Sequence, residues 1–420
     1  MSTTSTMSTT YRPALVVVGN GMAGMRTVEE LLALAPGMYD ITVFGAEPHV
    51  NYNRIMLSPV LAGDKTQDDI VLHPRAWYAE HGITLHTGDP VVAIDRRRRS
   101  VRSQSGVEVV YDRLLLATGS QPFIVPVPGA DLPGVVGFRD LIDVDTMLQA
   151  ARDGRHAVVI GGGLLGLEAA NGLLRRGMDV TVVHLTGSLL NQQLDGDASL
   201  LLKGALERRG LRILLGVQTE AILGDGKVAS VRLSNGVMLP ADLVVMAAGV
   251  RPNVALARAA GLHVERAIVV DDTLQSYDPR VYAVGECVQH RRATFGLVAP
   301  IWEQARVCAA HLAGFGHRRY VQQAVATKLK VTGIDLYSAG DIVGGPGTQD
   351  LVLRDRRSGM YKRLVLDGNR LTGAVLYGDV ADGPWYFDLI GRGVDISAIR
   401  DRLLFGPALC DAQAAWKATP

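Results

Sequence analysis

The feature that most constrains this sequence is a unit that occurs twice: a buried strand, a glycine-rich turn, a helix and a second buried strand. In the first copy, the apolar run Leu15–Val18 and the stretch 41–45 are predicted strands with a helix-forming stretch between them. The second copy occupies residues 156–185, roughly 140 residues later. Each copy is a βαβ unit, so the repeat predicts an α/β protein with two half-domains built on parallel sheets.

Both turns carry the pattern GxGxxG directly between the strand and the helix. The first glycine permits the tight turn, the second lets backbone amides approach a pyrophosphate, and the third allows close packing of helix on strand. The helix N-terminus adds a partial positive charge, so each turn predicts a dinucleotide site. The residues of the two turns that we expect to contact nucleotide are Gly19, Gly21, Met22, Ala23 and Gly24, and Gly161, Gly163, Leu164, Leu165 and Gly166.

The residues expected at the ribose are less regular than the glycines. After the second strand of the first unit, the nearest carboxylate is Glu47, which is either a ribose ligand or a solvated turn residue. The equivalent strand of the second unit ends in His184, which cannot accept two ribose hydroxyl bonds as a carboxylate does, and no arginine stands there for a 2′-phosphate. Glu168 lies one turn into the second helix. The choice between NADH and NADPH therefore stays open.

Shorter strands with turn signals surround both units. Residues 91–119 predict a small meander leading into a strand, with the basic run Arg96–Arg99 as a solvated hairpin turn. Residues 228–249 have the same form, with Asn235 and Gly236 as a hairpin turn. From about residue 326 the glycine fingerprints cease, and the pattern predicts a separate C-terminal α+β domain.

Length and composition fit a multidomain globular protein. A chain of 420 residues is too long for one ordinary core, and 48% hydrophobic with 20% charged residues is the balance of a soluble protein. The formal net charge of +1 gives no general attraction to nucleic acid or to an anionic membrane. No apolar run approaches the ~20 residues that span a bilayer, and the N-terminus has no signal-peptide pattern. We expect a cytoplasmic protein with no nucleic-acid or membrane partner.

The cysteines make no recognisable motif. Cys287, Cys308 and Cys410 are far apart and form neither a disulfide framework nor a CxxC or CxxxxC pattern. This spacing fits a reducing compartment and gives no reason to expect a metal site.

Two further strands, 114–119 and 244–249, end in small-residue turns, and a third signature runs from Val281 to Glu286 after the segment 273–276. With the two fingerprints, these segments resemble the two-dinucleotide-binding flavoprotein superfamily, which includes ferredoxin and rubredoxin reductases, glutathione reductase and apoptosis-inducing factor. The resemblance covers about residues 14–320. It implies a glutathione-reductase-like three-layer ββα fold, with two Rossmann-like domains and the C-terminal α+β domain.

The resemblance also assigns the cofactors and the domains. It implies FAD at the first fingerprint and NADH or NADPH, as substrate, at the second. We expect a disordered tail over 1–13, an FAD-binding domain over 14–119 and 245–325, an NAD(P)H-binding domain over 120–244 and the C-terminal domain over 326–420. Hydride transfer is then cofactor chemistry and no side chain is expected to be catalytic.

Further site residues follow from the same resemblance. Glu286 stands where the family usually has an aspartate bonded to the FAD ribitol, and Arg54 stands where relatives place an arginine against FAD; a surface arginine is the alternative. A helix beginning near Pro300 would direct its positive end at the flavin, with an amphipathic helix start as the alternative. The remaining expected contacts are Ala117, Thr118, Gly119, Gly285, Trp302 and Glu303 for FAD, and Ala248 and Gly249 for NAD(P)H.

Within the superfamily, the chain most resembles the FAD- and NAD(P)H-binding part of the assimilatory nitrite reductase large subunit. The matching stretches include ITVFGAEPHVNYNRIMLS and VTVVHLTGSLLNQQLD. The sequence ends at Pro420 with neither the cysteine clusters of an iron–sulfur domain nor the length for a sirohaem domain. We therefore expect a stand-alone electron-transfer subunit of a nitrate or nitrite reductase system. Its acceptor would be a separate protein with an iron–sulfur, haem, sirohaem or molybdenum centre.

Other members of the superfamily fit less well. A disulfide reductase needs CxxxxC in the first helix, and residues 19–34 contain no cysteine; a single-cysteine peroxidase needs a thiol near Ser58. Pro59 replaces a lysine of ferredoxin reductases and apoptosis-inducing factor. A rubredoxin or ferredoxin reductase is the alternative enzyme, and a flavin-based redox sensor is the alternative of another class. The natural acceptor and the oligomeric state stay open.

Overall fold

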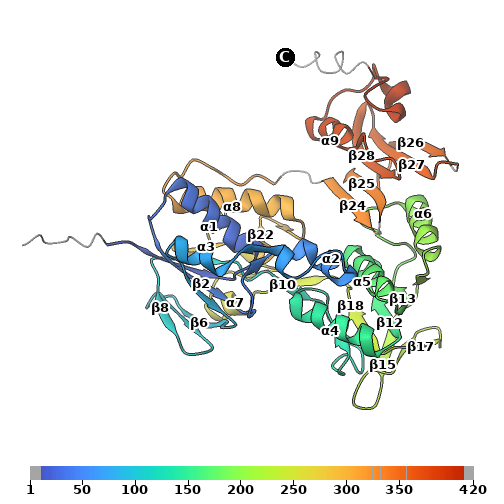
Figure 1. The fold of residues 1–420 in the computed structure, drawn as a ribbon. Coiled ribbons are helices and arrows are strands. Elements are labelled where there is room, and N and C mark those ends of the chain that lie inside the picture. Colours follow the sequence, from blue (N-terminus) through green and yellow to red (C-terminus); the bar gives the residue numbers. More distant parts are fainter. Residues whose placement is uncertain (1–10, 323–325, 332, 356, 411–420) are drawn as a thin grey trace, which may run out of the picture. The chain divides into compact units, whose positions relative to one another are not determined.

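The computed structural model describes residues 11–322, 326–331, 333–355 and 357–410. Most of the predicted N-terminal tail, residues 1–10, lies outside them. The chain divides into two compact units (Figure 1). Unit 1 comprises Met1–Ile55, Gln67–Gln121 and Arg251–Gln323, and unit 2 comprises Met56–Thr66, Pro122–Val250 and Ala324–Pro420.

Unit 1 is built on a five-stranded parallel sheet in the order β21-β9-β1-β2-β5. The strand β1 (Ala14–Val18) lies at its centre, and its four apolar residues from Leu15 on are buried because both faces of the sheet are covered. The other strands are β2 (Asp40–Gly45), β5 (Thr84–Thr87), β9 (Arg113–Leu116) and β21 (Val281–Ala283). The helices α1 (Met22–Leu34) and α8 (Val298–Leu312) pack against each other.

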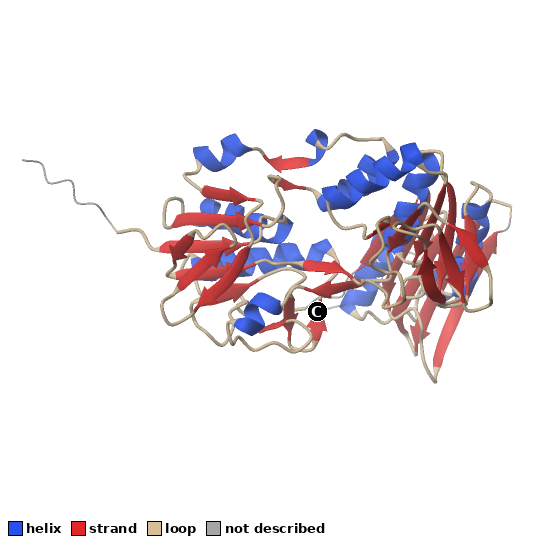
Figure 2. Cartoon of the chain, turned by 90° about the horizontal axis from the view of Figure 1, so that it is seen from below, coloured by secondary structure: helices blue, strands red, loops and turns tan. Residues whose placement is uncertain are grey.

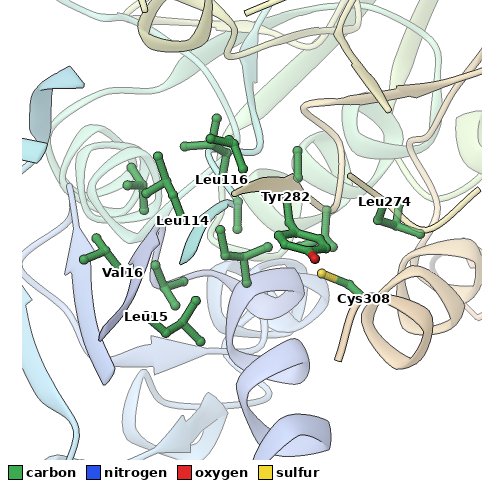
Figure 3. Close-up of a cluster of buried hydrophobic side chains, with 14 of the residues drawn as sticks. Leu15, Val16, Leu114, Leu116, Leu274, Tyr282 and Cys308 are labelled. Carbon is green, nitrogen blue, oxygen red and sulfur yellow. The ribbon is translucent and has the colours of Figure 1, made fainter. Parts of the chain in front are cut away.

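The core of unit 1 joins segments that are distant in the sequence. Figure 3 shows Leu15 and Val16 beside Leu114 and Leu116, with Leu274, Tyr282 and Cys308 from much later in the chain in the same cluster. Smaller elements surround this core: β3 (Asn51–Tyr52), η1 (Arg54–Met56), η2 (Asp68–Ile70), β4 (Val71–His73), α3 (Arg75–Glu80), α7 (Ala255–Ala259), β20 (Ile268–Val270), β22 (Val288–His290) and β23 (Ala293–Thr294). The predicted meander is present as β6 (Val91–Asp95), β7 (Ser100–Ser103) and β8 (Glu108–Val110). The predicted turn at Arg96–Arg99 joins the first two of these strands.

Unit 2 repeats the same arrangement in a second five-stranded sheet, β11-β18-β12-β13-β14. Its strands are β11 (Val135–Val136), β12 (His156–Ile160), β13 (Asp179–His184), β14 (Arg212–Leu215) and β18 (Leu243–Met246), and its helices are α4 (Leu141–Asp153), α5 (Leu164–Arg175) and α6 (Gly196–Glu207). A meander of β15 (Thr219–Leu223), β16 (Ser230–Leu233) and β17 (Met238–Pro240) contains the predicted turn at Asn235 and Gly236. The short strands β10 (Ser120–Pro122) and β19 (Val250–Pro252) lie where the chain passes between the units.

The C-terminal part of unit 2 is an antiparallel sheet in the order β24-β25-β28-β27-β26 with α9 against it (Figure 1). The elements are β24 (Ala326–Val331), β25 (Ile334–Gly340), β26 (Thr348–Asp355), β27 (Met360–Asp367), β28 (Arg370–Tyr377), α9 (Gly383–Arg392) and η3 (Arg400–Phe405). Figure 2 shows the sheets and their helices in separate colours. The predicted fold class, two Rossmann-like sheets followed by an α+β domain, is confirmed. The predicted domain boundaries stay a prediction.

One segment of the predicted first domain, Met56–Thr66, belongs to unit 2. Its helix α2 (Leu57–Ala62) packs on α5: the Arg176 guanidinium donates to the Leu61 carbonyl at 2.6 Å, and Arg175 pairs with Asp64 at 2.5 Å. A Cβ at Gly172, in the middle of α5, would lie 2.7 Å from the Leu61 side chain. This glycine therefore serves the contact between α2 and α5.

We expect Gly172→Ala to lower the free energy of unfolding by about 1–3 kcal/mol, since the added methyl group overpacks the contact with Leu61. Gly204→Ala is the matched control in α6, where a Cβ would lie 3.4 Å from its nearest neighbour, the Arg208 guanidinium. We expect this substitution to raise the free energy of unfolding by about 0.5–1 kcal/mol, because alanine has a higher helix propensity than glycine. Urea unfolding measures both. Equal stabilisation by the two substitutions would contradict the packing assigned to Gly172.

Candidate functional site

The predicted FAD residues of unit 1 gather at one edge of its sheet. Because β21, β9, β1 and β2 are adjacent and parallel, their carboxyl ends lie side by side. These ends carry Gly285 and Glu286 after β21, Ala117, Thr118 and Gly119 after β9, Gly19 and Gly21 after β1, and Glu47 after β2. Open α/β sheets bind ligands at this edge.

The glycines of the first turn have three distinct roles. Gly19 has φ +119°, and a Cβ there would lie 2.1 Å from the Ala117 carbonyl oxygen; a Cβ at Gly24 would lie 2.6 Å from the Gly19 carbonyl oxygen. These two positions exclude side chains because backbone fills the space. Gly21 has an ordinary φ of −85°, and a Cβ there would meet nothing within 4 Å. Its missing side chain therefore leaves an open cradle, as a bound diphosphate requires.

The N-terminus of α1 adds donors to this cradle. No side chain caps it, and its first turn contains no acidic residue. In two other helices an aspartate takes this place: Asp140 accepts from the Asp143 amide of α4, and Asp195 from the Ala198 amide of α6, each at 2.9 Å. The uncapped amides of α1 suit an anionic ligand such as a phosphate.

Charged residues line the same edge. Ser120 donates to Glu286 at 2.6 Å. Glu47 accepts from the Tyr52 hydroxyl at 2.6 Å and from the guanidinium of Arg54, which also lies over the Tyr52 ring. Glu47 and Arg54 are therefore partly buried and paired with each other. Glu47 is not a solvated turn residue, and Arg54 is not a free surface arginine.

The helix α8 begins at Val298, two residues before the predicted start near Pro300. Its N-terminus has no side-chain cap either. Trp302 lies under the Arg26 guanidinium of α1, and Glu303 pairs with Arg306 at 2.6 Å. The connection from α8 to the strand ends is made by Gln304, which is fully buried and accepts from the Gly285 amide at 2.8 Å. Sequence reasoning missed Gln304, whose only signal is an uncharged polar residue inside an apolar helix.

Unit 2 repeats the geometry of the first turn. Gly161 has φ +129°, with a Cβ position 2.2 Å from the Ala247 carbonyl oxygen, and a Cβ at Gly166 would lie 2.0 Å from the Gly161 carbonyl oxygen. Gly163 again has nothing within 4 Å of its Cβ position, and α5 starts there without a side-chain cap. The predicted residues Ala248 and Gly249 follow β18 at the same sheet edge.

His184 supports this second turn. Its Nδ1 accepts from the Gly162 amide at 3.0 Å, its Nε2 lies 2.9 Å from the Thr186 hydroxyl, and burial lowers the pKa of the imidazole. A Cβ at Gly162 would lie 2.8 Å from the His184 ring. A glycine at the middle position of the three, Gly162, is therefore required by His184, a relation that the sequence pattern did not reveal.

The side chains of the predicted residues on α5 lie in different environments. Leu164 and Leu165 form the first turn, and the Leu165 side chain is exposed. Burial raises the pKa of the Glu168 carboxyl, against the opposing effect of a hydrogen bond from Ser58. Glu168 and Ser58 both belong to unit 2, so this pair adds to the contact between α2 and α5.

Among the described residues, no three or more His, Cys, Asp or Glu side chains form a cluster suited to a metal ion. Within the same part of the chain, no helix is both long and apolar enough to cross a membrane.

The fold and the two fingerprints define an FAD- and NAD(P)-dependent oxidoreductase. Residues 13–313 match the family described as pyridine nucleotide-disulphide oxidoreductase, and the chain belongs to that family. Residues 326–394 match the rubredoxin NAD+ reductase C-terminal domain. The predicted superfamily is confirmed.

Similar proteins carry related names. The chain is 49% identical over 383 residues to a Bacillus subtilis (strain 168) protein named nitrite reductase (NAD(P)H), covering 91% of this chain and 48% of that protein. It is 44% identical to the assimilatory nitrate reductase electron transfer subunit of the same organism, covering 93% of this chain and 51% of the relative. The chain thus spans about half the length of these curated relatives.

Among solved structures, the chain is similar to putidaredoxin reductase in its covalent complex with putidaredoxin. The TM-score is 0.86 at 28% identity, covering 98% of this chain and all of the other. NADH:rubredoxin oxidoreductase from Clostridium acetobutylicum gives a TM-score of 0.78 at 25% identity, with 94% of this chain and 100% of that chain covered.

We expect Gly21→Val to fold normally and to lose FAD, because its side chain would enter the open cradle, where a Cβ has no protein atom within 4 Å. Gly19→Val is the contrasting variant, since its Cβ would clash with the Ala117 backbone and lower stability. The flavin-to-protein absorbance ratio and the thermal unfolding midpoint separate the two effects. A Gly21→Val protein that keeps its flavin would refute the assignment of the cradle.

We expect the second turn to bind its dinucleotide more weakly at acid pH. The lowered pKa of His184 means that the neutral ring is the form that accepts from the Gly162 amide. This contribution is full above the ordinary histidine pKa of about 6.5 and is lost as the pH falls through the lowered folded value. Calorimetric titration with NAD+ should show weaker binding below about pH 6. The His184→Leu variant should lack this pH dependence, and an unchanged dependence in that variant would exclude His184 as its source.

Proposed function

We propose that unit 1 binds FAD, that unit 2 binds NADH or NADPH, and that the chain passes electrons from NAD(P)H through FAD to a separate redox protein. The acceptor we propose is a reductase subunit of a nitrate or nitrite assimilation system in the cytoplasm. The observation that carries the cofactor assignment is the pair of open cradles at Gly21 and Gly163, each at an uncapped helix N-terminus.

The chain's own residues bind and orient the two nucleotides in this proposal. The amides after Gly21 and Gly163 hold the diphosphates, and Glu47 and Glu286 are proposed for the ribose and ribitol hydroxyls of FAD. Arg54 fixes Glu47 through their ion pair, and the N-terminus of α8 places partial positive charge at the flavin. His184 acts on the nicotinamide nucleotide indirectly, by holding Gly162.

When bound, the cofactors would supply the redox chemistry, which is hydride transfer from NAD(P)H to FAD and release of the electrons one at a time. Glu168 is the acid of unit 2 that stands one turn from the proposed diphosphate site. The Ser58 hydroxyl of α2 donates to its carboxylate, so Glu168 supports the nucleotide site indirectly, through the contact between α2 and α5.

The acceptor is proposed from the names of similar proteins. One relative is an electron transfer subunit of assimilatory nitrate reductase, and another is a nitrite reductase. A rubredoxin or ferredoxin reductase is the second candidate, which the match of residues 326–394 to the rubredoxin NAD+ reductase C-terminal domain favours.

Anaerobic titration with NADH and NADPH tests the proposal, with bleaching of the visible flavin bands as the signal. We expect full reduction by one equivalent of the preferred nucleotide and rapid turnover with ferricyanide. Slow reduction that stops at a long-lived charge-transfer complex would favour the redox sensor instead. An intact protein that is colourless and cannot be reconstituted with FAD would refute the cofactor assignment.

The acceptor is tested separately, by mixing the reduced protein with candidate partners. Reoxidation by a nitrate or nitrite reductase subunit at a rate at least about tenfold above that by rubredoxin is the expected result, since partner-specific docking speeds encounter by about this factor or more. Faster reoxidation by rubredoxin would establish the second candidate, a rubredoxin or ferredoxin reductase.

A further inference from the structure

In both turns, a hydrogen bond holds the carbonyl oxygen of the residue between the first two glycines. In unit 2, the Gly162 carbonyl oxygen accepts from the Leu190 amide at 3.0 Å. In unit 1, the equivalent carbonyl oxygen, that of Asn20, accepts from a side chain: the Asn51 Nδ2 group at 2.9 Å. The donor is thus a backbone amide in unit 2 and a side chain in unit 1, and a substitution can remove only the side chain.

This carbonyl matters because a peptide group is planar. The Asn20 C=O and the Gly21 N–H belong to one trans peptide and point in opposite directions. Holding the Asn20 oxygen on Asn51 therefore directs the Gly21 N–H away from Asn51. Gly19 and Gly21 flank Asn20, and glycines give this peptide more freedom to rotate than other residues would.

Asn51 is itself held by a buried network. It is 1% exposed, lies on β3 next to β4, and its Oδ1 is 2.9 Å from His73 Nδ1. His73 is also buried, and its Nε2 is 2.7 Å from a carboxylate oxygen of Glu29 on α1. Since the Asn51 amide nitrogen is engaged with Asn20, its oxygen is the atom that accepts from His73.

The groups around His73 favour this arrangement. The hydrogen bond from His73 holds the pKa of Glu29 below its usual range, despite partial burial, and Arg26 pairs with the other carboxylate oxygen. The Trp77 ring lies 4.2 Å from the His73 ring, with His81 on Trp77 at 4.4 Å. Both ring nitrogens of His73 therefore have acceptors.

Tyr78 completes the cage around Asn20. Its hydroxyl donates to Asn20 Oδ1 at 2.7 Å, and burial raises the pKa of Tyr78 to about 12, so the donor proton stays in place. Beyond Glu29, a pocket of about 640 Å³ lined by Arg26, Glu29, Trp77 and His81 opens on the outer side of the network.

We propose that Asn51 and His73 are positioning residues for FAD, which fix the Asn20–Gly21 peptide so that the Gly21 amide faces the diphosphate. This inference rests on the proposed binding of FAD to unit 1. Neither residue needs to touch the cofactor: His73 orients the Asn51 carboxamide, and Asn51 orients the peptide.

The hydrogen bonds of the two ring nitrogens of His73 can be tested separately by substitution. An asparagine at position 73 can place its amide near the position of Nδ1 and retain the bond to Asn51, whereas a glutamine reaches only the position of Nε2 and the bond to Glu29. The dissociation constant of FAD is measured by quenching of flavin fluorescence on titration of apo-protein. His81→Gln is the matched control, because His81 stacks on the same Trp77 without a bond to Asn51.

We expect Asn51→Leu and His73→Gln to weaken FAD binding by about tenfold or more, the effect of losing one buried hydrogen bond. His73→Asn and His81→Gln should bind within about twofold of the unaltered protein, a difference too small for a lost hydrogen bond. NAD+ binding to unit 2 should be unchanged in all four variants, which shows that the effect is confined to unit 1.

Equal FAD affinity of His73→Asn and His73→Gln would overturn the proposal, as would an Asn51→Leu protein that binds FAD normally. If Asn51→Leu fails to fold, the comparison of the two His73 variants decides. Failure of the unaltered protein to bind FAD would refute the proposed function itself, an outcome that is distinct from equal binding by all variants.

Discussion

The close approach of backbone to backbone at the first glycine of each turn is the constraint on which both sites depend. Gly19 lies against the Ala117 carbonyl and Gly161 against the Ala247 carbonyl, at distances that admit no side chain. This contact brings the end of the central strand against the end of its neighbour, β9 in unit 1 and β18 in unit 2. The helix that follows then starts at the shared edge of the strands, where its free amides face the ligand position.

The two units support the same turn by different means. In unit 2, a histidine and a backbone amide hold Gly162, and in unit 1 a buried asparagine holds Asn20. Rigid support for the turn matters because hydrogen-bond donors that are oriented before binding lose little freedom when the anion arrives. The helices α4 and α6 carry aspartate caps at their N-termini, whereas α1, α5 and α8, the helices at the proposed sites, have no side-chain cap.

Local sequence patterns predicted the parts of the fold that local forces determine. The two βαβ units, the hairpin turns at Arg96–Arg99 and at Asn235 with Gly236, and the positions of the glycines all follow from strand periodicity and from the backbone freedom of glycine. The helix expected near Pro300 begins at Val298, and Pro300 lies in its first turn, where the missing N–H breaks no intrahelical hydrogen bond.

Contacts between distant residues could not be predicted in this way. The packing of α2 on α5 joins Leu61 to Gly172, and the bond from Gln304 to Gly285 joins a helix to a strand end. Neither contact has a period or a spacing in the sequence, since both depend on which segments meet after folding. The same holds for His184 and Gly162, where a histidine and a glycine that looked unrelated form one support.

Each turn is proposed to receive its own dinucleotide. Native mass spectrometry of the reconstituted protein, with FAD and NAD+ added separately and together, tests this most directly. We expect one FAD and one NAD+ per chain, with neither displacing the other. Competition of the two for a single site, or binding of only one of them, would contradict it.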